Sequence, residues 1–181
     1  MEPILNIPKT EQKRAVIIGA GFAGLEVAKG LCNHDFQIVV IDRNNYHQFP
    51  PLFYQVATAG LEPSAISFPL RKLFNRNRQL HFRMCELEKV DTAKSMIYTS
   101  IGYIDYDYLI IATGTDTNFY GDKDLEDNTL PMKSISEALY LRNTILRNYE
   151  KALQTDDIEE QKALMNVVIV GGGPTLSLIH I

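Results

Sequence analysis

The sequence predicts an α/β fold, in which helices and a parallel β-sheet pack in three layers. The first observation is an apolar, β-branched run, Ala15–Ile18, that leads directly into Gly19–Gly24, which reads Gly-x-Gly-x-x-Gly. The second is another apolar run, Gln37–Ile41, that ends in Asp42. A strand, a glycine-rich turn, a helix and a second strand in this order are typical of the Rossmann-like βαβ unit that binds dinucleotides.

Each glycine of the first turn is predicted to have its own role. Gly19 allows the tight turn, Gly21 lets the backbone approach a pyrophosphate, and Gly24 lets helix and strand pack closely. A helix over Phe22–Cys32 would direct N–H groups and the positive end of its dipole toward the phosphates. Asp42 follows the turn at the separation expected for an acid that binds a ribose 2′-hydroxyl. A helix cap or a surface loop is the alternative, and the complete order of elements favours the nucleotide.

The elements after Asp42 resume the sheet after an irregular segment. Residues 43–63 are rich in Asn, Pro and aromatic side chains, and they are too many for a simple turn. Long loops are often functional, and this one leaves the carboxyl end of a strand, where open α/β sheets place ligands. The pattern then predicts a short helix and three strands, over residues 65–74, 80–87, 95–99 and 106–112, respectively.

A long helix is predicted to begin at Ser134. Ser134 and Glu137 have the spacing of a capping box, in which each side chain bonds the backbone N–H of the other residue. Apolar residues between Ile135 and Leu153 form a partial stripe that would face a neighbouring element. Residues 156–160 form a charged break before another helical turn.

A second glycine-rich turn follows the apolar run Val167–Val170. The run predicts the first strand of a second nucleotide-binding unit, whose glycines at the ligand would be Gly171 and Gly173. Leu176 stands where the third glycine is expected, and five residues follow it. Because a βαβ unit needs about 30 residues, we expect a truncated gene fragment. The predicted domains are an N-terminal tail (1–13), the N-terminal part of a first nucleotide-binding domain (14–165) and the truncated start of a second (166–181).

Composition and charge limit the other functions open to the chain. Hydrophobic residues make up 45% and charged residues 22% of its 181 residues, which suits a soluble globular chain with one sizeable core. The net charge of −4 argues against nucleic acid as a partner, and the basic group between Arg71 and Arg78 is expected to be one solvated helix face. Cys32 and Cys85 lie far apart, so we predict core thiols and no metal site.

The sequence also bears on where the protein is located. Residues 1–14 contain no apolar leader segment, and no apolar run reaches the roughly 18 residues that suggest a membrane span. The sequence therefore predicts synthesis and location in the cytoplasm.

Five segments together carry a resemblance to one enzyme family. They are the turn 19–24, residues 42–47, the loop 49–61, the strand and turn 106–114, and residues 136–143 of the long helix. The loop, which reads Phe-Pro-Pro-Leu-Phe-Tyr-Gln-Val-Ala-Thr-Ala-Gly-Leu, is the most specific of them. Taken together, the segments resemble the type II NADH dehydrogenases, which are single-chain NADH:quinone oxidoreductases. The resemblance runs from about Arg14 to Thr175.

The resemblance implies a flavoprotein with two Rossmann-like domains, in which the NADH domain is inserted into the FAD domain. It also implies which residues bind FAD. Those at the pyrophosphate would be Gly19, Gly21, Phe22, Ala23 and Gly24. Asp42 would bind the adenosine ribose, with Arg43 beside it.

The resemblance assigns further residues to the other parts of FAD. Leu87 would meet the adenine through its backbone. Pro51 and Leu52 would lie beside the isoalloxazine ring. The residues that close over the cofactor would be Ala112, Thr113 and Gly114. For Leu87 and Ala112 an ordinary core position is an equal alternative, whereas Gly114 favours close backbone approach.

In this family the flavin carries the chemistry, so the resemblance implies no catalytic acid, base or nucleophile. NADH would be the substrate of the full-length parent, and a quinone would accept its electrons. The parent would be a peripheral protein on the cytoplasmic face of the inner membrane. The fragment alone would be inactive. His47 and Tyr54 are expected to be packed, hydrogen-bonded side chains. The alternatives are another two-dinucleotide flavoprotein, such as a sulfide:quinone or disulfide reductase, and a nucleotide-binding fragment without catalysis. The oligomeric state stays open.

Overall fold

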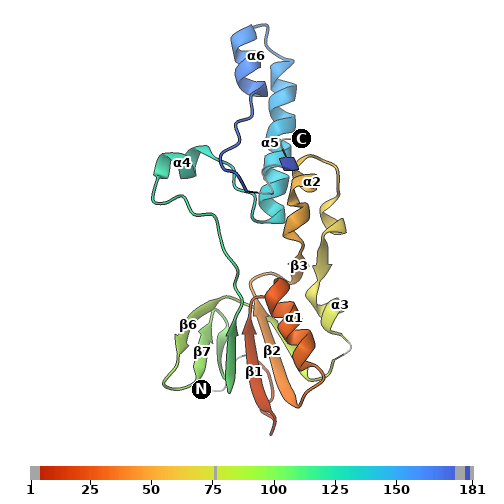
Figure 1. Cartoon of the computed structure of the whole chain (residues 1–181), viewed down its shortest axis with the longest axis vertical. Helices are drawn as coiled ribbons and strands as arrows, with labels where there is room; N and C mark the ends of the chain where they lie inside the picture. Colours follow the sequence, from red (N-terminus) through yellow and green to blue (C-terminus); the bar gives the residue numbers. More distant parts are fainter. Residues whose placement is uncertain (1–4, 76, 174–177, 180–181) are drawn as a thin grey trace. The chain divides into compact units, whose positions relative to one another are not determined.

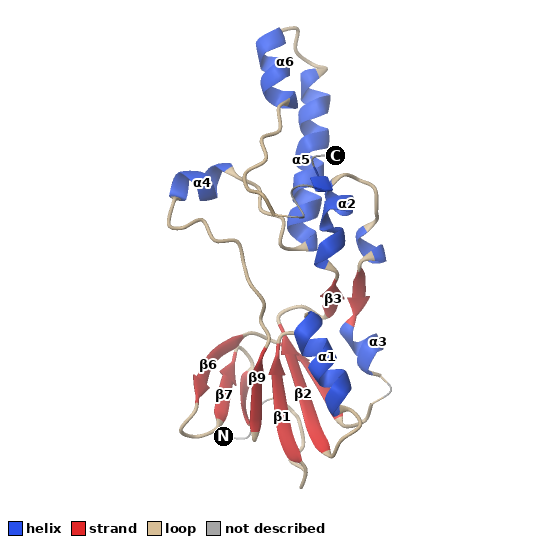
Figure 2. Ribbon diagram, in the orientation of Figure 1, coloured by secondary structure: helices blue, strands red, loops and turns tan. Residues whose placement is uncertain are grey.

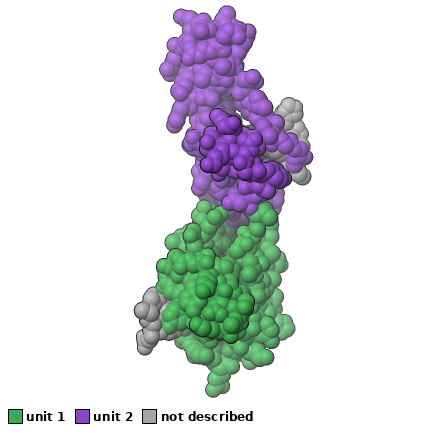
Figure 3. Space-filling view, turned by 90° about the vertical axis from the view of Figure 1, so that its left-hand side faces the viewer, with its two compact units in different colours: residues 1–47, 68–115 green, residues 48–67, 116–181 purple. Residues whose placement is uncertain are grey.

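The structure, a computed structural model, describes residues 5–75, 77–173 and 178–179 (Figure 1). Helices and strands are both present, as Figure 2 shows by colour. The chain divides into two compact units (Figure 3). Unit 1 comprises residues 1–47 and 68–115, and unit 2 comprises residues 48–67 and 116–181.

A four-stranded parallel sheet forms the centre of unit 1, with the strand order β5-β2-β1-β9. Figure 2 labels three of these strands, β2, β1 and β9. Ile18 pairs with Ile41 on one side and with Ile111 on the other, so three strands end level with one another. The segments that follow these strands therefore meet at one edge of the sheet. The strands are β1 (Lys13–Ile18), β2 (Phe36–Asp42), β5 (Leu80–Met84) and β9 (Tyr108–Ile111).

Two further layers cover the faces of this sheet. Because side chains alternate along a strand, Ile17 and Val40 face one core and Val16 and Val39 face the other. The first core is closed by the helices α1 (Phe22–Leu31) and α3 (Leu70–Phe74). The second is closed by an antiparallel sheet of β6 (Leu87–Asp91), β7 (Met96–Thr99) and β8 (Gly102–Asp105). The predicted three-layer α/β architecture is confirmed.

A buried polar network lies where β1 begins. Arg14 is 5% exposed, and its Nε donates to Oε1 of Gln37 at 2.6 Å. Its guanidinium also pairs with the carboxylate of Asp105. Burial would raise the pKa of Asp105, but the charges of Arg14 and Lys9 and the hydrogen bonds outweigh burial and lower that pKa. The network joins the start of β1 to β2 and β8, and through the Pro8 carbonyl to the preceding segment.

Between β3 (Tyr46–Gln48) and β4 (Ser67–Pro69), which pair as a two-stranded sheet, the chain forms three short helical segments. These are η1 (Pro50–Leu52), α2 (Phe53–Ala57) and η2 (Pro63–Ala65). The segment predicted as an irregular loop thus contains regular structure. The helix predicted over 65–74 begins at Leu70, because proline at position 69 disfavours a helical conformation in the residue before it.

The later helices of unit 2 are α4 (Lys123–Asn128), α5 (Ile135–Ala152) and α6 (Ile158–Met165). The capping box is confirmed: Ser134 Oγ accepts from the Glu137 N–H at 3.2 Å, and Glu137 Oε2 accepts from the Ser134 N–H at 3.0 Å. α5 packs against α2 and α6. No helix in the described part of the chain has both the length and the apolar composition that a membrane crossing requires.

Two strand predictions need correction. The strand predicted over 80–87 ends at Met84, and Leu87 begins β6, because the chain leaves the parallel sheet for the antiparallel layer between them. The strand predicted over Val167–Val170 is not formed, and Val168 is 78% exposed. No strand in the described ranges pairs with this run. A β-strand is stabilised by backbone hydrogen bonds to a neighbouring strand, and this run has none within those ranges. Leu176 lies outside the described residues.

Candidate functional site

The first glycine of the turn lies where β1 meets the segment after β9. The Gly19 N–H donates to the Ile41 carbonyl at 2.7 Å, and its φ of +98° is a conformation that favours glycine. A Cβ added to Gly19 would lie 2.3 Å from the carbonyl oxygen of Ala112. Any other residue would therefore push the two segments apart.

The other two glycines differ sharply in their surroundings. A Cβ on Gly24 would lie 1.8 Å from the carbonyl oxygen of Gly19, so α1 touches the turn with no room for a methyl group. Apart from its two chain neighbours, a Cβ on Gly21 would meet no atom of the described residues within 4 Å. The chain's own packing therefore requires glycine at positions 19 and 24 but not at 21. An open position in an otherwise tight turn suits a ligand that approaches the backbone.

The start of α1 suits a negatively charged ligand. Gly21 caps this ten-residue helix with no side-chain hydrogen bond, and the first turn contains no acidic residue. Phe22 and Ala23 are exposed there. The positive end of the helix dipole is thus not neutralised by a carboxylate of the protein within its first turn, and helix starts of this kind bind phosphates.

Asp42 lies at the end of β2 and anchors the turn. Its Oδ2 accepts from the Ala20 N–H and its Oδ1 from the Asn44 N–H, each at 2.7 Å. Sequence reasoning anticipated a ribose ligand and missed this anchoring role. An ionised carboxylate has about four lone-pair sites, so two backbone donors leave room for ribose hydroxyls. Arg43, the next residue, is exposed.

The remaining predicted residues of unit 1 lie around the same edge. The Ala112 N–H donates to the Ile18 carbonyl at 2.7 Å, which holds the segment after β9 against the turn. Thr113 and Gly114 are exposed, and Gly114 has a φ of +73°. Leu87 is half-buried, and its side chain packs against the second core.

Four predicted residues belong to unit 2. Pro51 is exposed and Leu52 half-buried, both within η1. Gly171 and Gly173 lie in an exposed segment without helix or strand, and Gly171 has a φ of +118°. The structure thus brings the predicted residues of unit 1 together at one edge of the sheet. The other four predicted residues belong to unit 2.

The two side chains expected to be packed are hydrogen-bonded. His47 is 8% exposed, and its Nδ1 lies 3.0 Å from the Ala20 carbonyl oxygen. The hydroxyl of Tyr54 accepts from Nε2 of Gln55 at 3.0 Å. The predicted hydrogen-bonded role is thus confirmed for both side chains; His47 is buried, and Tyr54 is half-buried.

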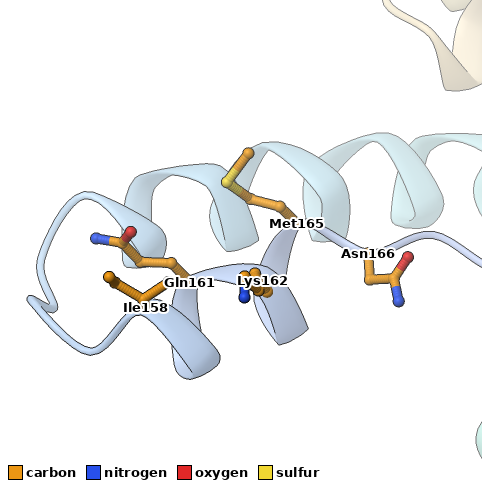
Figure 4. Close-up of a pocket in the computed structure, with 5 residues that line it drawn as sticks. All are labelled: Ile158, Gln161, Lys162, Met165 and Asn166. Carbon is orange, nitrogen blue, oxygen red and sulfur yellow. The ribbon is translucent and has the colours of Figure 1, made fainter.

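An open depression of about 590 Å³ lies on α6 in unit 2 (Figure 4). One titratable side chain lines it, Lys162, whose Nζ pairs with Glu159 at 2.8 Å. The sequence predicts no functional residue on this surface, and its described lining contains no His, Cys, Asp or Glu that could bind a metal. The lining residues are Ile158, Gln161, Lys162, Met165 and Asn166.

The two cysteines offer no redox pair. Cys32 packs against the core beneath α1, whereas Cys85 lies in the core on the opposite face of the sheet. Both thiols are free. Burial raises the pKa of the Cys85 thiol and outweighs the opposing effects of Thr99 and Arg83, which keeps the thiol protonated at neutral pH.

The known proteins that resemble this chain include NADH:quinone oxidoreductases. The chain is 35% identical over 178 residues to the type II NADH:quinone oxidoreductase Ndh of Mycobacterium tuberculosis, and the match covers 96% of this chain and 38% of that protein. This similarity confirms the resemblance seen in the motifs. The chain spans about a third of the length of the curated relatives that it matches.

Two solved structures are also similar. NDH2 from Plasmodium falciparum matches with a TM-score of 0.83 at 25% identity, over 93% of this chain and 36% of that one. A sulfide:quinone oxidoreductase from Aquifex aeolicus matches with a TM-score of 0.70 at 30% identity, over 76% of this chain and 32% of that one. Residues 13–175 match the family described as pyridine nucleotide-disulphide oxidoreductase. The chain belongs to the pyridine nucleotide-disulphide oxidoreductase family.

Proposed function

We propose that the chain binds FAD at its first glycine turn and is part of an NADH:quinone oxidoreductase. The observation that carries the proposal is the contrast between the glycines: Gly19 and Gly24 are enclosed by backbone, whereas the space at Gly21 is open. This open position lies at the start of a helix that no side chain caps. A dinucleotide pyrophosphate is the ligand that such a turn binds.

The residues of the turn would hold the cofactor through their backbone. Gly21, Phe22 and Ala23, with the dipole of α1 behind them, would bind the pyrophosphate. Asp42, already oriented by two backbone N–H groups, would accept hydrogen bonds from the ribose. When bound, FAD supplies the capacity to take a hydride and to release two electrons. We assign no catalytic side chain.

The other predicted contacts extend the same proposal. Leu87 would meet the adenine through its backbone, Ala112, Thr113 and Gly114 would close over FAD, and Arg43 would lie beside the ribose. Pro51 and Leu52 would meet the flavin ring. Gly171 and Gly173 would belong to the NADH site of the domain that follows residues 14–165. These assignments rest on the resemblance to the type II enzymes.

The electron acceptor would be a quinone, as the names of the relatives indicate for those proteins. Quinones of respiratory membranes are lipid-soluble, so the full protein would work as a peripheral protein at a membrane surface. NADH is a soluble substrate, and we propose the cytoplasmic face of the inner membrane. Membrane fractionation of the full gene product, with and without high salt, tests this location.

The first test concerns the identity of the cofactor. We expect the 181-residue chain to bind FAD at least about tenfold more tightly than FMN, because FMN lacks the ribose that Asp42 would bind and a charge-assisted hydrogen bond contributes roughly 1.5–3 kcal/mol. Quenching of flavin fluorescence during titration gives both dissociation constants. Equal affinity for FAD and FMN would remove the reason for assigning Asp42 to the ribose.

The second test concerns the reaction. We expect the full product of the gene to oxidise NADH with a soluble quinone in a flavin-dependent reaction, and the 181 residues alone to show no turnover even with added FAD. Hydride transfer needs nicotinamide and flavin in contact, and in the described residues the segment from Val167 to Gly173 is not folded as a strand and turn.

The same assay separates the runner-up function. The second candidate is sulfide:quinone oxidoreductase activity, because one similar solved structure, at 30% identity, is an enzyme of that name. In this version of the assay, sulfide replaces NADH as the electron donor. Turnover with sulfide and not with NADH would establish the alternative. Turnover of NADH by the 181-residue chain at the rate of the full product would show that its nicotinamide site has been misplaced.

A further inference from the structure

We propose that His47 is a positioning residue for the dinucleotide pyrophosphate, because it donates from Nδ1 to the carbonyl of Ala20 and so orients the peptide group that carries the Gly21 N–H. This inference rests on the proposed binding of FAD at the turn. It assigns a role to a side chain that the flavin chemistry leaves unused.

The contact defines which atom carries the proton. A carbonyl oxygen only accepts, so Nδ1 of His47, at 3.0 Å from the Ala20 oxygen, must be the donor. The neutral Nδ1–H tautomer and the protonated ring both supply this hydrogen.

Ala20 is held at both of its peptide groups. Its N–H donates to Oδ2 of Asp42 at 2.7 Å, and its carbonyl accepts from His47. Asp42 lies at the end of β2 and His47 lies in β3. One short segment, residues 42–47, therefore binds both the N–H and the carbonyl of Ala20. No peptide bond among the described residues is cis.

The orientation of this peptide group bears directly on an anion. In a trans peptide the carbonyl and the following N–H point in opposite directions, so fixing the Ala20 carbonyl toward His47 turns the Gly21 N–H away from it. A reversed peptide would present a carbonyl oxygen, instead of an N–H, to a pyrophosphate. His47 therefore favours the donor arrangement before a ligand arrives, which reduces the ordering that binding requires.

Packing keeps the imidazole in place. Its ring meets the ring of Phe22 edge to face, with centroids 5.4 Å apart and planes at 69°. Phe22 is the first residue of α1, so the helix start itself supports the histidine. An apolar side chain could fill the same buried space but would leave the Ala20 carbonyl without this partner.

The test compares three substitutions of His47 in the 181-residue chain. His47→Asn places an amide N–H near the position of Nδ1, His47→Gln places it near Nε2, and His47→Leu retains bulk without a donor. We expect His47→Leu and His47→Gln to raise the Kd for FAD about tenfold, and His47→Asn to stay within about threefold of the parent chain. Flavin fluorescence gives Kd, and the ³¹P spectrum of bound FAD reports the pyrophosphate environment.

Two controls accompany these variants. His34→Leu makes the same chemical change at an exposed histidine and should leave Kd unchanged. Gly21→Val should weaken binding by about a hundredfold or more and so verifies that the titration reads the pyrophosphate site. If the parent chain binds no FAD, the proposed function fails. If it binds FAD and the three His47 variants bind equally well, or equally poorly, the positioning role is refuted while FAD binding stands.

The comparison survives a folding defect in the apolar variant. If His47→Leu does not fold, the two amides still differ in where they place the donor. Retention of Kd and of the ³¹P shift by His47→Asn but not by His47→Gln supports the proposal. The opposite order, or no difference between these two folded variants, overturns it.

Discussion

Gly24→Ala is expected to lower the free energy of unfolding by about 3 kcal/mol or more, the upper end of what overpacking costs in a protein core. The new Cβ would lie 1.8 Å from the carbonyl oxygen of Gly19 and 3.0 Å from its carbonyl carbon. These are backbone atoms, and Gly19 is itself confined by the carbonyl of Ala112. The strain cannot be relieved by a change of rotamer, so α1 must move away from β1.

The same helix contains the matched control. Gly30 lies near the end of α1, and a Cβ there would meet no atom of the described residues within 4 Å beyond its chain neighbours and the backbone of its own helix. Gly30→Ala should therefore raise the free energy of unfolding by roughly 0.5–1 kcal/mol, because alanine favours the helix. Urea unfolding followed by circular dichroism measures both. A Gly24→Ala chain as stable as the parent would mean that α1 does not approach the turn as closely as described.

Gly21→Val is expected to weaken FAD binding by about a hundredfold or more while the chain stays folded. The added side chain would occupy the space at Gly21 that the pyrophosphate needs, and losing one or two charge-assisted hydrogen bonds at roughly 1.5–3 kcal/mol each accounts for that change. The fold should tolerate valine because a Cβ meets no other described residue within 4 Å beyond its chain neighbours, and because the backbone is extended, with φ −72° and ψ −165°.

The measurement is the FAD stoichiometry and Kd of Gly21→Val beside a Gly30→Val chain. The control adds the same side chain at the other end of α1, where no ligand is proposed. Its Kd for FAD should therefore equal that of the unsubstituted 181-residue chain. Unfolding midpoints show that both variants fold. A folded Gly21→Val chain that retains stoichiometric FAD would show that the phosphates lie elsewhere.

Local signals in the sequence were sufficient for the parts of this protein that depend on neighbours in the chain. The apolar run before Gly19, the helix after Gly21 and the strand that ends in Asp42 were all predicted and are all formed. The capping box at Ser134 was predicted with both of its hydrogen bonds. Each of these features is determined within a few residues, by periodicity, conformational preference or side-chain reach.

Features that depend on distant partners were decided by the tertiary structure alone. Val167–Val170 has the composition of a strand but forms none, because a strand exists through its ladder and the described residues provide no partner. Leu87 begins a second sheet and does not continue the first, since the path between layers is set by packing.

The same difference between local and tertiary features is found within the candidate site. The spacing between Gly24 and Asp42 indicated that an acid lies beside the turn, yet its hydrogen bond to the Ala20 N–H and the matching bond from His47 to the Ala20 carbonyl could not be foreseen. The sequence by itself determined which residues line the edge of the sheet, because parallel strands bring their carboxyl ends together. Only the tertiary structure decided which backbone groups those side chains hold, because hydrogen bonds depend on distances of a few tenths of an ångström that the order of residues does not encode.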